Sequence, residues 1–327
     1  MKLPRRKFLQ FAGAAAIAPA FSRGATAQPY PSRPITMVVP FAPGGGSDVA
    51  ARIVAEPMRK CLGQPVIIEN VGGAEGSIGV GRVARATPDG YTISHGITDT
   101  HVLNGGFYSL PYDVLNDFAP IAAQGAVPYV MLARQTMPAR NLPELIAWLK
   151  ANPNKASAGV QNSGVRLLIS LFRQQTGTQF ALVPYRGGGP AMQDLLAGQI
   201  DLLMAAPTIS LPPLGAGSIK AYAVTSDVRL TAASEIPTFA EMGLPALSYS
   251  NWVGLFAPKG TPKDIIGKLN AASVEAMADP AVRSRFAALE LEIFPREKQT
   301  PEALAALQKS NAERWWPVIK ELGIGAE

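Results

Sequence analysis

The sequence predicts an α/β fold of two domains with a cleft between them, and three observations support that prediction. Short runs of β-branched residues alternate with amphipathic stretches, which is the pattern of helices layered on mostly parallel sheets. The chain has 327 residues, of which 47% are hydrophobic, enough for a sizeable core in each of two domains. The strand pattern breaks near residues 124–128 and 248–256, which we interpret as two crossovers at a hinge.

The first 27 residues have the features of an export signal. A basic start that contains Arg5 and Arg6 precedes an apolar run, and a small-residue cleavage pattern ends at Ala27. Paired arginines followed by an aromatic residue and a leucine are typical of a twin-arginine signal. The apolar run is shorter than the roughly 20 residues that cross a bilayer. We therefore expect a periplasmic protein that is not inserted in the membrane.

The charge and the scarcity of reactive side chains limit the function classes. The net charge is +6, but the signal carries five of the 30 lysines and arginines and no acidic residue, which leaves 25 basic against 24 acidic residues. A broad positive field for nucleic acid is therefore not expected. The single cysteine, Cys61, is expected to be a buried small apolar residue. With only His95 and His101 as histidines, we expect no metal, no cofactor and no catalysis.

The expected elements give the domain boundaries. The helix that follows the first strand contains Pro57, which is expected to kink it. Asn141 followed by a proline near the first turn predicts the start of a helix over 142–150, and the last helix, 301–322, is expected to pack on the first domain. Strands are expected at 34–39, 66–70, 91–94, 127–132, 180–183, 200–204, 221–225 and 252–257. We expect a first domain of residues 28–125 and 250–327, and a second of residues 126–249.

Three junctions between a strand and the next helix are rich in glycine: PGGGSD at 43–48, GGAEGS at 72–77 and YRGGGP at 185–190. Glycine lets backbone N–H groups turn toward a ligand, and the helix N-terminus behind them carries partial positive charge. Each junction could therefore seat an anion, and three of them suit a ligand with more than one carboxylate. The alternative is that the glycines only make tight turns.

Seven motifs, in order along the mature chain, resemble the substrate-binding proteins of tripartite tricarboxylate transporters, the Bug receptors. They are VPFAPGGGSD with AR at 39–52, IEN at 68–70, ATPDGYT at 86–92, His101 with Asn104, YD and DF at 112–118, PYRG at 184–187 with Asp194, Leu195, Gly198 and Asp201, and WPVIK at 316–320. The resemblance implies a Venus-flytrap fold of the periplasmic-binding-protein type (type II-like). It also implies that loop amides and ordered waters hold a small carboxylate. A membrane transporter would then receive this ligand chemically unchanged.

Two departures from the family pattern affect the expected pocket wall. Relatives usually have Gly-Ser-x-His where this chain reads NSGVR at 162–166, and many carry Phe-Asp/Ala-Asn where it reads MAAP at 204–207. Arg166 could pair with a distal carboxylate of the ligand, or it could be an ordinary exposed helix residue. The ligand is expected to be a di- or tricarboxylate or an aromatic acid, and the protein a monomer. The predicted ligand-binding residues are Phe41, Pro43, Gly44, Gly45, Gly46, Ser47, Ala74, Ser77, Thr98, His101, Asn162, Ser163, Arg166, Tyr185, Gly187, Gly188, Ala206 and Pro207.

Three other function classes have some support in the sequence. GVGRVA at 79–84 mimics the glycine pattern of a dinucleotide-binding oxidoreductase, with Asp99 twenty residues after Gly79. Those glycines should follow their strand directly, yet the strand at 66–70 ends nine residues earlier, so we place them inside a helix. EGSIG at 75–79 lacks the first glycine of a hydrolase elbow. A sensor that presents its ligand to a membrane kinase needs the same closed state as a transport receptor, so the sequence is compatible with either partner.

Overall fold

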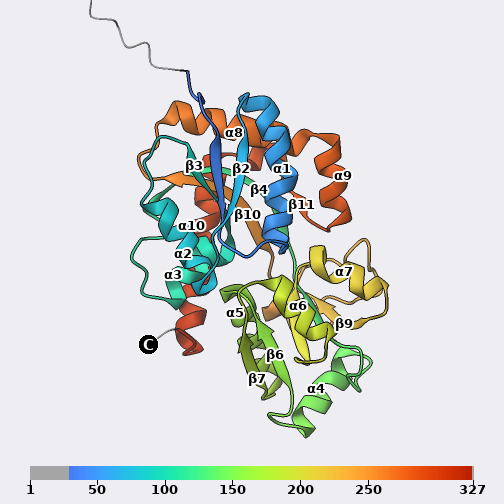
Figure 1. The fold of residues 1–327 in the computed structure, drawn as a ribbon. Coiled ribbons are helices and arrows are strands. Elements are labelled where there is room, and N and C mark those ends of the chain that lie inside the picture. Colours follow the sequence, from blue (N-terminus) through green and yellow to red (C-terminus); the bar gives the residue numbers. More distant parts are fainter. Residues whose placement is uncertain (1–28, 326–327) are drawn as a thin grey trace, which may run out of the picture.

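The computed structural model describes residues 29–325, so the expected export signal lies outside the described residues. Their strands form two sheets, which Figure 1 shows one above the other. The first sheet has six strands, in the order β11-β4-β10-β3-β1-β2, and the second has five, in the order β7-β6-β8-β5-β9. The first sheet consists of β1 (Ile35–Val39), β2 (Val66–Asn70), β3 (Thr92–Ile97), β4 (Phe118–Val127), β10 (Asn251–Pro258) and β11 (Glu292–Ile293). The second consists of β5 (Val130–Arg134), β6 (Ser157–Val160), β7 (Ala181–Pro184), β8 (Leu202–Ala205) and β9 (Ile219–Val224).

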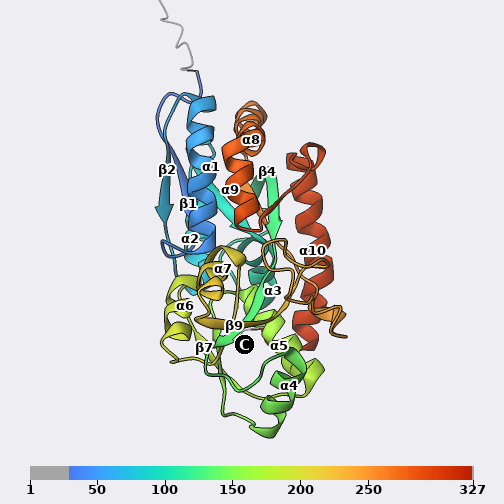
Figure 2. The same ribbon diagram turned by 90° about the vertical axis from the view of Figure 1, so that its right-hand side faces the viewer.

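The helices divide between the two sheets in the same way. In Figures 1 and 2 the helices near both ends of the chain surround the first sheet and those of its middle part surround the second. The first group is α1 (Gly46–Leu62), α2 (Ser77–Ala84), α3 (Asn104–Phe107), α8 (Lys263–Ala278), α9 (Pro280–Ala288) and α10 (Pro301–Glu321), with the short turns η1 (Ala74–Gly76) and η2 (Asp99–Leu103). The second group is α4 (Leu142–Ala151), α5 (Ser163–Thr176), α6 (Gly188–Leu196) and α7 (Pro207–Gly215). Among residues 29–325, no helix has both the length and the hydropathy to span a membrane.

The chain passes twice between the sheets. It leaves the first sheet at the end of β4 and enters the second at β5, then returns between β9 and β10. The strands next to these passages pair antiparallel: β4 and β3 with β10, and β5 with β8 and β9. The expectation of mostly parallel sheets is therefore wrong. The parallel pairs are β1 with β2 and β3, and β6 with β7 and β8, and a helix joins consecutive strands within each of these two groups.

Several local expectations are confirmed and one, the burial of Cys61, is wrong. The side chain of Asn141 accepts a hydrogen bond from the N–H of Glu144 and caps α4, and α10 lies on the first sheet against β4. Helix α1 continues through Pro57 to Leu62. Cys61, expected to be buried, is exposed because it lies on the solvent side of the last turn of α1. β4 and β6 were not expected, since their sequences are rich in alanine, glycine and serine rather than β-branched residues.

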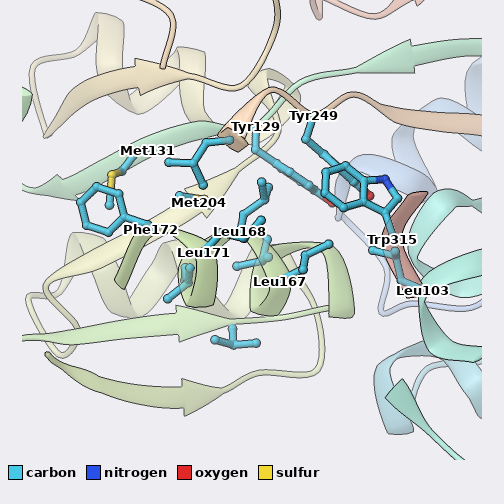
Figure 3. Packing of buried hydrophobic residues seen from close by; sticks show 14 of the residues in the cluster. Leu103, Tyr129, Met131, Leu167, Leu168, Leu171, Phe172, Met204, Tyr249 and Trp315 are labelled. Carbon is cyan, nitrogen blue, oxygen red and sulfur yellow. The ribbon is translucent and has the colours of Figure 1, made fainter. Parts of the chain in front are cut away.

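One hydrophobic core extends from the second domain into the first. Leu167 and Leu168 of α5 belong to the same buried cluster as Leu103 of η2 and Trp315 of α10. Figure 3 shows these labelled side chains from close by. Apolar burial at roughly 25 cal/mol per Å² therefore stabilises the interdomain contact as well as each domain.

The glycines of GVGRVA lie inside α2, as expected, and their role there is close packing. A Cβ on Gly79 would lie 2.6 Å from the Val71 carbonyl oxygen and 3.0 Å from Pro40 Cα, both of them backbone atoms that cannot rotate away. We expect Gly79→Ala to lower the free energy of unfolding by about 2 kcal/mol. Gly267→Ala is the matched control, because Gly267 lies in α8 with open space around it. In urea denaturation the control should gain up to about 1 kcal/mol from helix propensity, and equal behaviour of the two variants would contradict the packing role.

Candidate functional site

A cavity of ≈ 70 Å³ lies between the two domains. The loops of the two domains approach each other closely around it. A Cβ on Gly46 would come within 2.8 Å of Thr208 Oγ1, and one on Gly187 within 3.8 Å of Ala42 Cβ. The lining comes from both domains: Phe41, Ala42, Pro43, Gly45, Gly46, Ser47, Ala50, Ile97, Val127, Tyr129, Gln161, Asn162, Gly187, Gly188, Gly189, Pro190, Ala206, Thr208, Ile209, Asn251, Val253 and Leu291.

The N-termini of four helices converge on this cavity. α1 comes from the first domain, and α5, α6 and α7 come from the second; the N-cap residue of each lines the cavity. The first N–H groups of a helix have no partner within the helix, and the helix dipole adds partial positive charge at that end. No N-cap side chain satisfies the N–H groups of α1, α6 or α7. These helix ends therefore present free donors to one small volume.

The side chains of the lining carry no formal charge. Among the residues that the structure describes, the lining includes no aspartate, glutamate, lysine, arginine or histidine. Its polar groups are three amides, two aliphatic hydroxyls and one phenol. An anion in the cavity would thus be bound by backbone dipoles and neutral donors rather than by an ion pair, which is how helix N-termini bind carboxylates and phosphates.

Beside the cavity, a buried aspartate joins the two domains. Asp99 of η2 accepts hydrogen bonds from the hydroxyls of Tyr129 (3.0 Å) and Tyr249 (2.8 Å) and from the Asn251 side-chain amide (3.1 Å). Asn162, the N-cap of α5, donates to the Tyr129 hydroxyl at 3.0 Å. Tyr129 and Asn251 lie at the two interdomain passages, and Figure 3 shows Tyr129 and Tyr249 stacked side by side. Asp99 therefore connects both passages and α5 to the first domain.

Burial raises the pKa of the Asp99 carboxyl to about 6, although the hydrogen bonds from Tyr249, Tyr129 and Asn251 act in the opposite direction. Burial also lowers the pKa of two histidines of the first domain, that of His101 to about 3 and that of His95 in β3 to about 4. The first domain thus buries one carboxyl that resists ionisation and two histidines that resist protonation.

The structure brings half of the predicted ligand-binding residues into the cavity lining. Those that line it are Phe41, Pro43, Gly45, Gly46, Ser47, Asn162, Gly187, Gly188 and Ala206. Two of the three glycine junctions, 43–48 and 185–190, thus face each other across the cavity. The lining also contains Gln161, Tyr129, Asn251 and Thr208, which were not predicted, because each lies outside the glycine motifs.

The other predicted residues have contacts elsewhere. Gly44 and Pro207 flank the cavity, the N–H of Gly44 donating to Asp48 Oδ2 at 3.0 Å. The Tyr185 hydroxyl donates to Asp194, and Ser163 Oγ donates to Asn104 Oδ1 at 2.6 Å. The N–H of Thr98 donates to Asn251 Oδ1, and the ring of His101 stacks on Phe256 with centroids 4.2 Å apart. Each of these side chains belongs to the packing around the cavity rather than to its surface.

The middle glycine junction and Arg166 also differ from expectation. Ala74 and Ser77 line a separate cavity of ≈ 520 Å³ at the surface of the first domain. Between them, Glu75 pairs with Arg166 of α5 across the domain interface. The Glu75 carboxylate would repel an anion at this junction, and it already pairs with Arg166, the nearby cation. Arg166 is therefore an interdomain ion-pair partner, and it is absent from the lining of the cavity at the helix N-termini.

Comparison with known proteins identifies the family. The family model described as the tripartite tricarboxylate transporter family receptor matches residues 50–324. The chain belongs to this family. Its fold is similar to that of the periplasmic binding protein BugD, at 37% identity and a TM-score of 0.88 over 91% of this chain and 100% of that one. It is also similar to MatC from Rhodopseudomonas palustris with bound malate (35% identity, TM-score 0.86, 89% and 100% covered), and to an R. palustris protein solved with adipate (31% identity, TM-score 0.85, 90% and 99% covered).

The position of Arg166 in this receptor leads to a testable expectation. Its partner Glu75 is largely buried, with 13% of its side chain exposed, so Arg166→Met should lower the free energy of unfolding by about 1–3 kcal/mol. The ratio of affinities for dicarboxylates and monocarboxylates should not change, because Arg166 does not reach the cavity lining. Calorimetric titration measures this ratio, and the double variant Glu75→Gln/Arg166→Met should recover part of the lost stability. A selective loss of dicarboxylate affinity would show instead that Arg166 contacts the ligand.

Proposed function

We propose that this protein is a periplasmic solute-binding receptor that captures a small carboxylate between its two domains and releases it to the membrane subunits of a tripartite tricarboxylate transporter. One observation carries the proposal: four helix N-termini from both domains meet at a single small cavity whose lining side chains are uncharged. Such a site attracts an anion through backbone N–H groups, and no negatively charged side chain of the lining would repel one.

The site suits binding rather than chemistry. A catalytic centre needs a nucleophile or a general base within reach of the bound molecule. The two histidines are buried against aromatic side chains and β-strands, outside the lining, and Asp99 holds the hinge contacts. We therefore propose that the ligand leaves unchanged. The similar structures with malate and adipate support a small carboxylate as the ligand class.

Export and delivery belong to the same proposal. The expected twin-arginine signal at residues 1–27 would place the receptor in the periplasm, and the family description supports a transporter as the recipient. We propose that the protein acts as a monomer. Its ligand would close the two domains by contacting Gly46 and Ser47 on one side and Gly188 on the other, which gives the membrane subunits a closed form to recognise.

A thermal-shift screen tests the proposed ligand class. The panel should contain mono-, di- and tricarboxylates, aliphatic and aromatic, with neutral sugars and zwitterionic amino acids as controls. A ligand at about 100 times its dissociation constant stabilises the folded state by roughly 2.7 kcal/mol, which corresponds to several degrees in a chain of this size. We expect at least one carboxylate to raise the melting temperature by this amount. A shift produced only by a sugar or an amino acid would overturn the proposal.

A further inference from the structure

Gln161, a residue of the cavity lining, has a side-chain oxygen that lacks a hydrogen-bond donor, and an ionised carboxylate cannot supply one. Gln161 lies between β6 and the N-cap of α5 and is only 4% exposed. Its side-chain Nε2 donates to the carbonyl oxygen of Met204 at 2.6 Å. A carbonyl can only accept, so this contact fixes the amide orientation and leaves Oε1 as the free atom. In residues 29–325, no protein group donates a hydrogen bond to Gln161 Oε1.

Leaving such an acceptor unsatisfied is costly. A buried polar atom without a partner loses its hydration and gains nothing in return, so native structures nearly always supply one. An ionised carboxylate has only acceptor oxygens and would face Gln161 Oε1 unfavourably. The free hydroxyl of Thr208, also in the lining, can donate or accept and therefore imposes no such requirement.

The charge of the lining then narrows the possible donors. An ammonium group could donate to Gln161, but its positive charge would be desolvated, and no carboxylate of the described residues belongs to the lining. A neutral hydroxyl donates one hydrogen bond at far lower desolvation cost. The N–H groups of α1, α6 and α7 supply donors for the acid group, while Gln161 supplies an acceptor, so the lining complements two different groups of one molecule.

We propose that the ligand is a hydroxycarboxylate, whose hydroxyl donates to Gln161 Oε1 while its carboxylate receives the helix N–H groups. This inference rests on the proposed function, since it presumes that an acid occupies the cavity. It makes Gln161 a residue that determines specificity between acids that differ by a single hydroxyl.

Calorimetric titration with matched pairs of acids tests the proposal. The pairs are lactate and propionate, malate and succinate, 2-hydroxyglutarate and glutarate, and mandelate and phenylacetate. In the pair that binds most tightly, we expect the wild-type protein to bind the hydroxy acid about tenfold or more tightly than its deoxy partner. Gln161→Met keeps the side-chain volume but removes the acceptor, and it should bring the two affinities to within about threefold.

Gln124→Met is the matched control, because Gln124 is also a buried amide but lies in β4, where it donates to Ser273 Oγ at 3.1 Å. It should keep the hydroxyl preference of the wild type. Equal or tighter binding of the deoxy acid by the wild type would overturn the inference and leave the proposed function standing, with water as the donor to Gln161. Failure of every acid to bind would overturn both. The wild-type comparison decides the matter even if Gln161→Met does not fold.

Discussion

Acidification from pH 7 to pH 4.5 is expected to lower the free energy of unfolding by about 3 kcal/mol. Two buried histidines are responsible, because burial lowers the pKa of His95 to about 4 and that of His101 to about 3. In the unfolded chain a histidine titrates near 6.5. Between pH 6.5 and 4.5 the unfolded state therefore binds two protons that the folded state excludes, and stability that is fully present above pH 6.5 is lost as the pH falls.

Asp99 opposes the histidines. Burial raises the pKa of its carboxyl from 3.8 to about 6, so the folded state binds this proton before the unfolded state does. Stability contributed by protonated Asp99 increases as the pH falls through 6, by about 2 kcal/mol at pH 4.5. Each histidine removes about 2–3 kcal/mol over the same interval, and the two together exceed the gain from Asp99.

Two variants separate these contributions, because they change the acid-induced loss of unfolding free energy in opposite directions. His95→Leu removes one histidine and should reduce the acid loss to nearly zero. Asp99→Asn removes the opposing carboxyl and should increase the loss to about 5 kcal/mol. Urea denaturation at pH 7 and pH 4.5 measures both, and the exposed glutamates that titrate near pH 4.5 contribute equally to the wild type and to both variants. Equal stability of the wild type at the two pH values, or shifts of both variants in one direction, would contradict the assignment.

The sequence predicted the local features that short motifs encode, such as helix caps, glycine junctions and strands rich in β-branched residues. Strand β2 has the expected bounds, Asn141 caps α4, and the glycine junctions at 43–48 and 185–190 line the cavity. β6 has the sequence SAGV and lacks β-branched residues at most positions, because Gly159 lies close to Ile200 and Leu203, where larger side chains would not fit. That constraint comes from tertiary packing and leaves no periodic pattern to read.

The parts of the site that were missed depend on residues far apart in the chain. Asp99 bonds to Tyr129, Tyr249 and Asn251, which are 30, 150 and 152 positions away, and none of them belongs to a recognisable motif. The junction at 72–77 resembles the other two in glycine content, yet Glu75 pairs with Arg166 there. Glycine content alone cannot distinguish a junction that could bind an anionic ligand from one that contains a carboxylate of the protein itself, as the junction at 72–77 contains Glu75.

We propose that backbone N–H groups at the helix ends bind the carboxylate, so removing one of them should produce a large loss of affinity. Ser47 is the second residue of α1 and lines the cavity. Ser47→Pro deletes its N–H while keeping a backbone conformation suited to a helix start. The chain already carries Pro143 at the same position of α4. Ser47→Ala is the matched control, since it removes only the hydroxyl.

Calorimetric titration of the tightest-binding acid into the wild type and these two variants is the most direct test. A hydrogen bond to a charged group contributes about 1.5–3 kcal/mol, so Ser47→Pro should bind roughly 10- to 100-fold more weakly than Ser47→Ala. The melting temperatures of the two unliganded variants should be similar, which would confine the difference to the bound state. Equal affinities of Ser47→Pro and Ser47→Ala would contradict recognition of the carboxylate by the N-terminus of α1.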